Sequence, residues 1–135
     1  MSDYDKRRKR GVAILKKMGR EKLMLEQKAL CPDMYEMSVG HLFGDVWARP
    51  GLSLRERQLV TLAANIALAR PTGNYSHYRS AKHIGITHEE ICELMIQVGH
   101  YAGWPTISNA VRQYTAVLEE DELIKKGKKR KSTLV

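Results

Sequence analysis

The sequence has little of what marks several common protein classes. Its 135 residues include only two cysteines, Cys31 and Cys92, which form no Cys-x-x-Cys pair, so neither a disulfide scaffold nor a zinc cluster is indicated. No stretch approaches the ~20 consecutive apolar residues of a membrane span, and the charged segment 1–10 has no apolar run typical of a signal peptide. We therefore expect a cytoplasmic protein with two reduced thiols and no membrane partner.

Several signatures of catalysis are also missing. The sequence has no Gly-x-Gly-x-x-Gly, no Walker loop and no Gly-x-Ser-x-Gly, so nucleotide binding and serine hydrolysis lack their usual motifs. His77 and His83 lie six positions apart and face different ways on a helix, and His88 lies beyond a turn. Because no pair has the i, i+4 spacing of a helical metal site, we expect no bound metal.

The net charge of +8 is concentrated at the two ends of the chain. Residues 1–20 hold eight Lys and Arg and residues 125–131 hold six, whereas residues 21–124 have a net charge of −4. Such basic runs can bind phosphate backbones nonspecifically or act as a nuclear-import-like address, although they are more often solvated tails. We expect one domain over residues 1–124 and a basic tail over 125–135, with nucleic acid bound only nonspecifically through the ends.

Apolar residues recur with helical spacing and strand alternation is nearly absent, which predicts an all-α domain of six or seven helices. Residues 44–52 are expected to form an irregular connection, because Pro50 and Gly51 break helices. The expected helices span about residues 3–18, 32–43, 53–70, 74–84, 88–102 and from 105 into the basic tail.

Local signals mark the ends of these helices. Ser53 with Glu56, and Thr87 with Glu90, are capping boxes; Asn74 is expected to cap the helix that Gly85 ends. The segment 60–69 is apolar on nearly every side, so its helix is expected to be central and enclosed. The remaining helices are short, so other subunits are expected to cover part of the apolar surface in a homo-oligomer.

Candidate functional residues stand out where polar groups lie in apolar or irregular context. His77 shares a helix face with Ala81, so it is either a core histidine bonded to a backbone carbonyl or part of a pocket. His41 is expected to converge on the same space. Arg49, between Trp47 and Pro50, is a candidate carboxylate clamp, since guanidinium binds carboxylates bidentately.

Aromatic residues offer walls for a small-molecule pocket, although aromatics at helical spacing are more often core. They are Tyr75, Tyr78, Tyr101 and Trp104.

Linked motifs in one order resemble the carboxymuconolactone decarboxylase family over about residues 7–118. The motifs are His41-x-x-Gly44-Asp45-Val46-Trp47-x-Arg49-Pro50-Gly51-Leu52, Arg57-x-Leu59-Val60-Thr61-Leu62-Ala63, His77-x-x-x-Ala81-x-x-x-Gly85-Ile86-Thr87-x-Glu89-Glu90-Ile91-x-Glu93 and Gln97-x-x-x-Tyr101-x-Gly103-x-Pro105. The resemblance implies an all-helical subunit in a ring, typically a trimer or hexamer, without metal or organic cofactor. Its decarboxylase branch implies loss of carbon dioxide from a carboxylated lactone, 4-carboxymuconolactone, in aromatic-acid catabolism.

The resemblance also implies roles for the candidate residues. His77 would donate a proton, Arg49 and Arg79 would bind the carboxylate, and His41 or Tyr75 would stabilise an oxyanion. The other expected substrate contacts are Trp47, Asn74 and Tyr101.

One position departs from the resemblance. The decarboxylase branch resembles Glu-Leu-x-x-His, whereas position 73 here is Gly, so the carboxylate four residues before His77 is absent. The peroxidase-type branch has Cys-x-x-Cys-x-x-x-His, and Arg70 and Gly73 replace those cysteines, which excludes that redox chemistry. Two alternatives therefore stay open: an isomerase or other proton-transfer enzyme on a related ring, and a noncatalytic ligand-binding or scaffold member.

Overall fold

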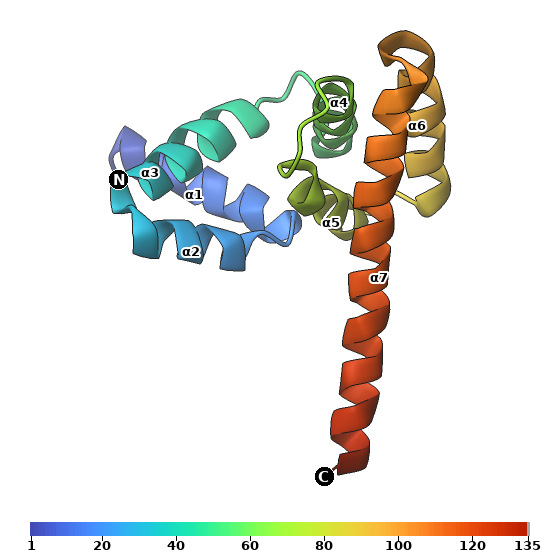
Figure 1. Ribbon diagram of the computed structural model, residues 1–135. Coiled ribbons are helices and arrows are strands. Elements are labelled where there is room, and N and C mark those ends of the chain that lie inside the picture. Colours follow the sequence, from blue (N-terminus) through green and yellow to red (C-terminus); the bar gives the residue numbers. More distant parts are fainter. Residues whose placement is uncertain (135) are drawn as a thin grey trace.

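The computed structural model describes the backbone of residues 1–134 and the side chains of residues 1–127. Within that range every regular element is a helix, which confirms the all-α prediction (Figure 1). None of these helices has the length and apolar character needed to cross a bilayer. In chain order the elements are α1 (Asp3–Lys17), α2 (Glu21–Leu30), α3 (Pro32–Met37), the π-helical η1 (Ser38–Trp47), α4 (Leu54–Ala67), α5 (Asn74–Ile84), α6 (His88–Ala102) and α7 (Trp104–Leu134).

The N-terminal elements form one of two hydrophobic clusters. Leu15 and Met18 of the predicted α1 stripe are buried against Phe43 and Trp47 of η1. Gly11 lets the two backbones touch, because a Cβ there would lie 1.9 Å from the Val39 carbonyl oxygen. This close crossing holds η1, and with it Trp47, against α1.

The connection predicted over residues 44–52 is mostly helical. The helix that begins at Pro32 passes from α3 into η1 without a break and ends at Trp47, so only residues 48–53 are irregular. The wider π turn depends on packing against α1, where a Cβ on Gly44 would lie 2.3 Å from the Arg7 carbonyl oxygen. Pro50 and Gly51 therefore end the helix later than the sequence suggests.

Helix α2 is absent from the sequence prediction. Its apolar residues Leu23, Met24, Leu25 and Leu30 are spread around the helix, and only Met24 is buried. No side chain caps its N-terminus. Neither of the usual sequence signals of a helix is therefore present.

The elements α4 to α7 enclose the second hydrophobic cluster. Both predicted capping boxes form, at Ser53 and at Thr87, and Gly85 ends α5 with a φ of 88°. The prediction for Asn74 is wrong: Gly73 is the N-cap of α5, and Asn74 is buried as the first residue of the helix. A buried Asn74 side chain contributes to the interior instead of the cap.

The prediction that helix 53–70 is enclosed on all sides is wrong for the single chain. The buried residues of α4 are Gln58, Leu62 and Ile66, which form one stripe. Val60 is 58% exposed and Leu68 is 63% exposed, on the other sides of the helix. The apolar exterior of α4 is thus available to another molecule.

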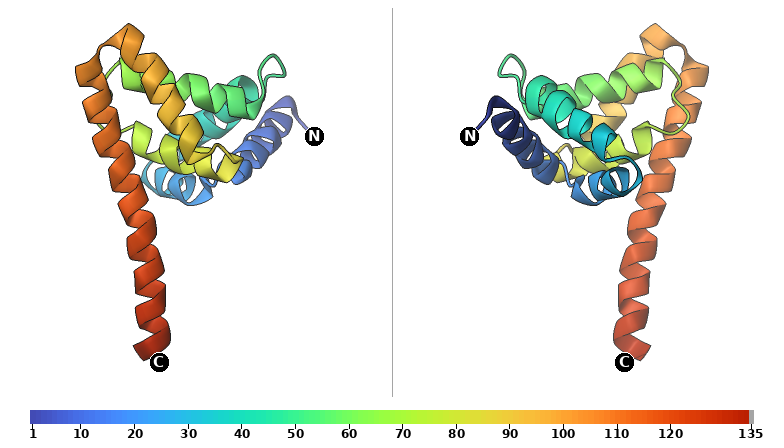
Figure 2. Two further views of the ribbon diagram at one scale, coloured as in Figure 1. Left: turned by 90° about the vertical axis from the view of Figure 1, so that its right-hand side faces the viewer. Right: turned by 90° about the vertical axis from the view of Figure 1, so that its left-hand side faces the viewer.

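Helix α7 is much longer than the others and projects beyond the body, as both views in Figure 2 show. The predicted last helix does run into the basic tail, and its backbone continues through residue 124 to Leu134 without interruption. The side chains of residues 128–135 lie outside the described residues, so the division between a domain and a tail at 124/125 stays a prediction.

The N-terminal basic run is not a solvated tail. It lies within α1, where Arg7 and Arg10 form ion pairs with Asp45, at 3.3 Å in each case. Arg8 forms an ion pair of 3.5 Å with Glu36. These arginines hold α1 to α3 and η1, which reduces the positive charge that is free for other partners.

Candidate active site

His77 lies on the side of α5 that faces α4 and η1, where the two hydrophobic clusters meet. The fully buried Gln58 of α4 reaches it: Gln58 Nε2 donates to the His77 carbonyl oxygen at 2.9 Å and lies 3.2 Å from His77 Nδ1. The sequence left two alternatives for His77, a core histidine bonded to a backbone carbonyl or part of a pocket; among the described contacts the ring meets the Gln58 amide, and the carbonyl that takes part is that of His77 itself.

This contact determines the tautomer of His77. The amide group that faces a carbonyl oxygen must be the NH2 end, because two oxygens would repel each other. The same nitrogen faces Nδ1, which must therefore accept a hydrogen bond, so the proton of the neutral imidazole lies on Nε2. Gln58 thus orients the ring and leaves Nε2–H as its available donor.

Aromatic rings of η1 cover the imidazole. The buried Trp47 stacks on His77, with ring centroids 6.0 Å apart and planes inclined by 9°. Phe43, one helical turn earlier, stacks on Trp47 at 6.0 Å. The close crossing of α1 and η1 therefore determines where this aromatic wall meets α5.

Arg20, at the start of α2, brings a positive charge to the same wall. Its guanidinium carbon lies 5.8 Å from the centroid of Phe43, and Nη1 donates to Ser80 Oγ of α5 at 3.4 Å. Its Nε is enclosed and bonds to none of the described residues. Burial lowers the pKa of Arg20 from its usual value.

The surroundings keep His77 uncharged at neutral pH. Burial, and after it the nearby Arg20 charge, lowers the pKa of His77 to about 4. Both effects disfavour the imidazolium, burial by removing water and Arg20 by repulsion. A neutral, oriented histidine beside an unpaired arginine is therefore the chemical centre of the site.

A hollow of about 110 Å³ opens on the outer side of Trp47. Arg57 and Thr61 of α4 supply its polar lining, and Arg57 also donates from Nη2 to the Arg49 carbonyl oxygen at 3.0 Å. The rest of the lining is apolar and comes from Val46, Leu52 and Val60, whose side chains are substantially exposed.

Comparison with known proteins identifies the family. The model described as the carboxymuconolactone decarboxylase family matches residues 32–116, well over half of the chain. The chain belongs to the carboxymuconolactone decarboxylase family. The resemblance predicted from the sequence motifs is therefore confirmed.

Two proteins with similar sequences are named as decarboxylases. A 4-carboxymuconolactone decarboxylase of Acinetobacter baylyi is 36% identical over 78 residues, which cover 58% of each chain. A nitrosuccinic acid decarboxylase of Metarhizium robertsii is 35% identical over 69 residues, 51% of this chain and 48% of the relative. The chain thus matches only about half of the length of these relatives.

The family motif residues on η1 lie in different surroundings. Trp47 meets His77, whereas the His41 side chain is 72% exposed and pairs with Asp45, with Nδ1 3.5 Å from Oδ2. Arg49 is exposed in the connection that leads to α4. The roles of His41 and Arg49 in catalysis stay predictions.

The remaining predicted contacts are also dispersed. Tyr75 packs against the α4 to α7 cluster, and Asn74 is buried at the start of α5. Arg79 is occupied by Glu120 of α7, with bonds of 3.0 Å from Nε and 2.8 Å from Nη2. Tyr101 is 87% exposed at the end of α6. Their roles in substrate binding stay predictions.

The position of the missing family carboxylate is open space. Gly73 has a φ of −57°, and a Cβ added there would meet no atom within 4 Å. Glu36 and Asp45 do not replace it at His77, because both pair with arginines of α1. Among the described residues the only charge acting on His77 is that of Arg20.

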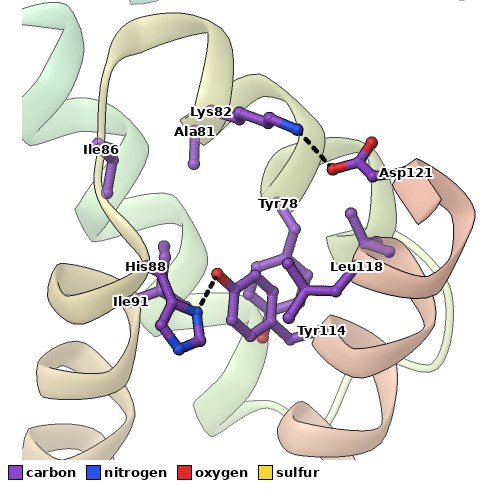
Figure 3. A pocket seen from close by; sticks show the side chains of 10 residues that line it. Tyr78, Ala81, Lys82, Ile86, His88, Ile91, Tyr114, Leu118 and Asp121 are labelled. Atoms are coloured by element: carbon purple, nitrogen blue, oxygen red, sulfur yellow. Dashed lines mark hydrogen bonds and ion pairs between the residues drawn. The ribbon is translucent and has the colours of Figure 1, made fainter. Parts of the chain in front are cut away.

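A second hollow, of about 150 Å³, lies on the other side of α5, between α6 and α7. Figure 3 shows His88 meeting Tyr114 along one edge, with the Nδ1 and hydroxyl oxygen 2.9 Å apart, while Lys82 and Asp121 pair at 2.6 Å along another. Its other lining is mainly apolar. His77 is not among its lining residues.

Sequence reasoning missed Gln58 and Arg20. Gln58 has a signal, because it occupies the same i, i+4, i+8 stripe as Leu62 and Ile66, where a polar side chain must find a buried partner. Arg20 has none, because it belongs to the start of α2, which shows no amphipathic pattern.

Proposed function

We propose that the chain is a cofactor-free decarboxylase of a small carboxylated compound, with His77 at the reacting centre. The observation that carries the proposal is the neutral His77, held by Gln58 against Trp47 and next to Arg20. Membership of the family and the names of both relatives support the same class of reaction.

The two named substrates share a chemical property. Each has a carboxylate next to a group that accepts an electron pair. In 4-carboxymuconolactone this group is an unsaturated lactone, and in nitrosuccinic acid it is a nitro group. When the carbon–carbon bond breaks, carbon dioxide leaves and the electron pair delocalises into that group. With the lactone this gives a dienolate, so the substrate needs no added electron sink.

Catalysis then requires the protein to stabilise an oxyanion and to supply a proton to carbon. We assign the proton to His77, whose Nε2–H is the free donor of the ring. Because the imidazole is neutral in the free chain, the assignment requires substrate binding to raise its pKa. The transfer leaves the imidazole neutral, and His77 takes up a proton from solvent again when the next substrate binds.

The substrate site would extend over Trp47 into the hollow that Arg57 and Thr61 line. Its exposed rim, with Val60 at its edge, would be closed by a second copy of the chain. We therefore propose a ring-shaped homo-oligomer, a trimer or hexamer, acting in the cytoplasm on products of aromatic-acid breakdown. Light scattering that found a stable 15.4 kDa monomer would contradict the oligomer.

Carbon dioxide release from 4-carboxymuconolactone by the purified chain tests the activity. We expect release that His77→Ala abolishes while its circular dichroism spectrum stays that of the native chain. Disappearance of substrate without carbon dioxide would instead indicate an isomerase. A folded oligomer that neither consumes nor binds the lactone would favour a noncatalytic role.

A further inference from the structure

The guanidinium of Arg20 is partly buried, and no carboxylate of the described residues forms an ion pair with it. It donates to the neutral hydroxyl of Ser80 over a long 3.4 Å, and its enclosed Nε bonds to none of the described residues. The ring of Phe43 provides its other contact, at 5.8 Å. Arg20 forms no ion pair with any carboxylate of residues 1–127, unlike the arginines at positions 7, 8, 10, 55 and 79.

An unpaired cation in this setting is costly. Removing a guanidinium from water is offset only when charge or hydrogen bonds replace the lost hydration. A hydroxyl and an aromatic face supply part of this. Arg20 still has some exposure to solvent, so a small anion can reach it. The arrangement suits an anionic ligand better than it suits a purely structural arginine.

We propose that the Arg20 guanidinium binds the carboxylate of a small anionic ligand beside His77. The ligand class, a carboxylated organic acid, rests on the proposed function. The position follows from shared neighbours: Ser80 lies three residues after His77 on α5, and Phe43 and Trp47 form one stacked wall that reaches from Arg20 to His77.

The bound carboxylate would also change His77. Its negative charge would offset the repulsion that Arg20 exerts on an imidazolium and would add an attraction of its own. His77 would then take up a proton on Nδ1 when ligand binds, and the Gln58 amide nitrogen would move away from that atom, because both would then be donors. The acid needed after carbon–carbon cleavage would thus form only in the complex.

Succinate tests the binding step separately from turnover, because it has two carboxylates but no group that accepts the electron pair. Succinamide is its neutral counterpart. The affinities and the His77 ring resonances would be measured by titration calorimetry and NMR for the wild type, Arg20→Gln and the control Arg112→Gln, which removes an exposed arginine of α7.

We expect wild type and Arg112→Gln to prefer succinate to succinamide, with proton uptake at His77. Arg20→Gln should raise the succinate Kd about 10- to 100-fold, the range for losing a hydrogen bond between charged groups. In the free Arg20→Gln variant the pKa of His77 should rise, because a repelling charge is gone. A merely structural arginine would not link the ligand to the His77 resonance.

Three results would overturn the proposal. The first is equal binding of succinate and succinamide by the wild type, and the second is an unchanged succinate Kd in Arg20→Gln. The third is an Arg20→Gln variant whose oligomer mass changes while it still binds succinate. The third result would mean that the Arg20 guanidinium pairs with a carboxylate of a second copy of the chain. If Arg20→Gln does not fold, Arg20→Lys decides, since an unchanged Kd there would mean that the guanidinium fork is not used. Arg20-dependent binding without any turnover would support this site and contradict the decarboxylase.

Discussion

The two sides of α5 carry similar histidine–aromatic pairs in different surroundings. His77 stacks on Trp47 at 6.0 Å and is half-buried among Gln58 and Arg20. His88 stacks on Tyr114 at 5.6 Å, bonds to the tyrosine hydroxyl and is exposed. The ring chemistry is the same, so the difference lies in burial and in the adjacent arginine. The enclosed pair is the one whose protonation a ligand can control.

Replacing each histidine gives the largest expected contrast. His77→Gln should lower the decarboxylation kcat by about 100- to 10,000-fold, the usual contribution of a general acid. His88→Gln should leave kcat within a few-fold, because it lies on the opposite side of α5. Steady-state kinetics of both variants, each checked for native fold, would make the comparison. Equal losses in the two variants would end the distinction between the two sides.

The pH dependence of stability should also reveal the buried imidazole of His77. The folded pKa of His77 is about 4, below the unfolded value of 6.5, so between these values the unfolded state binds more protons. This contribution to stability is therefore complete above pH 6.5 and is lost as the pH falls toward 4. The loss amounts to about 3 kcal/mol at most.

Urea unfolding at pH 7.5 and pH 4.5 measures this effect. The wild type should lose more stability than His77→Gln over that interval, because only the wild type carries the buried imidazole. If His77→Gln and the wild type change in parallel, the imidazole is accessible enough to be protonated in the folded chain.

How far the sequence predicts this molecule depends on whether a signal is local. Ser53, Thr87 and Gly85 act within one turn of the chain, and all three mark helix ends as predicted. The length of η1 depends on contact with α1 through Gly11 and Gly44, and a glycine does not by itself show which element it will meet. A one-dimensional pattern contains no such long-range information.

The residues of the candidate site also differ in whether a local sequence signal marks them. The family motifs identify His77 and Trp47, which the structure brings together. Arg20 is missed because its role comes from being enclosed by Phe43 and Ser80, residues more than 20 positions away. Arg79 looked like a carboxylate clamp, but α7 supplies Glu120 to it. Pairing between distant elements decides which arginines remain without a partner.

Gly73→Glu restores the charge that the decarboxylase branch has at this position. The backbone angle and the open space indicate that the side chain fits, and its carboxylate would lie one helical turn before His77. The pKa of His77 should rise, because an opposite charge favours the imidazolium. We expect turnover of 4-carboxymuconolactone to increase several-fold.

NMR titration of the His77 ring and kcat would be measured together, with Gly73→Gln as the uncharged control. A raised pKa without faster turnover would mean that proton supply does not limit the reaction. A pKa equal in the Glu and Gln variants would show that the new carboxylate points away from the imidazole.

The smallest expected effect concerns the exposed pair. Tyr114→Phe removes the hydroxyl that meets His88 Nδ1 at 2.9 Å but keeps the stacked ring and the lining of the second hollow. Because water replaces such an exposed bond, the free energy of unfolding should fall by about 1 kcal/mol or less. Decarboxylation and succinate affinity should not change. The Tyr114 hydroxyl contacts His88 and not His77. A loss of turnover in this variant would therefore show that the His88 side of α5 also takes part in the reaction.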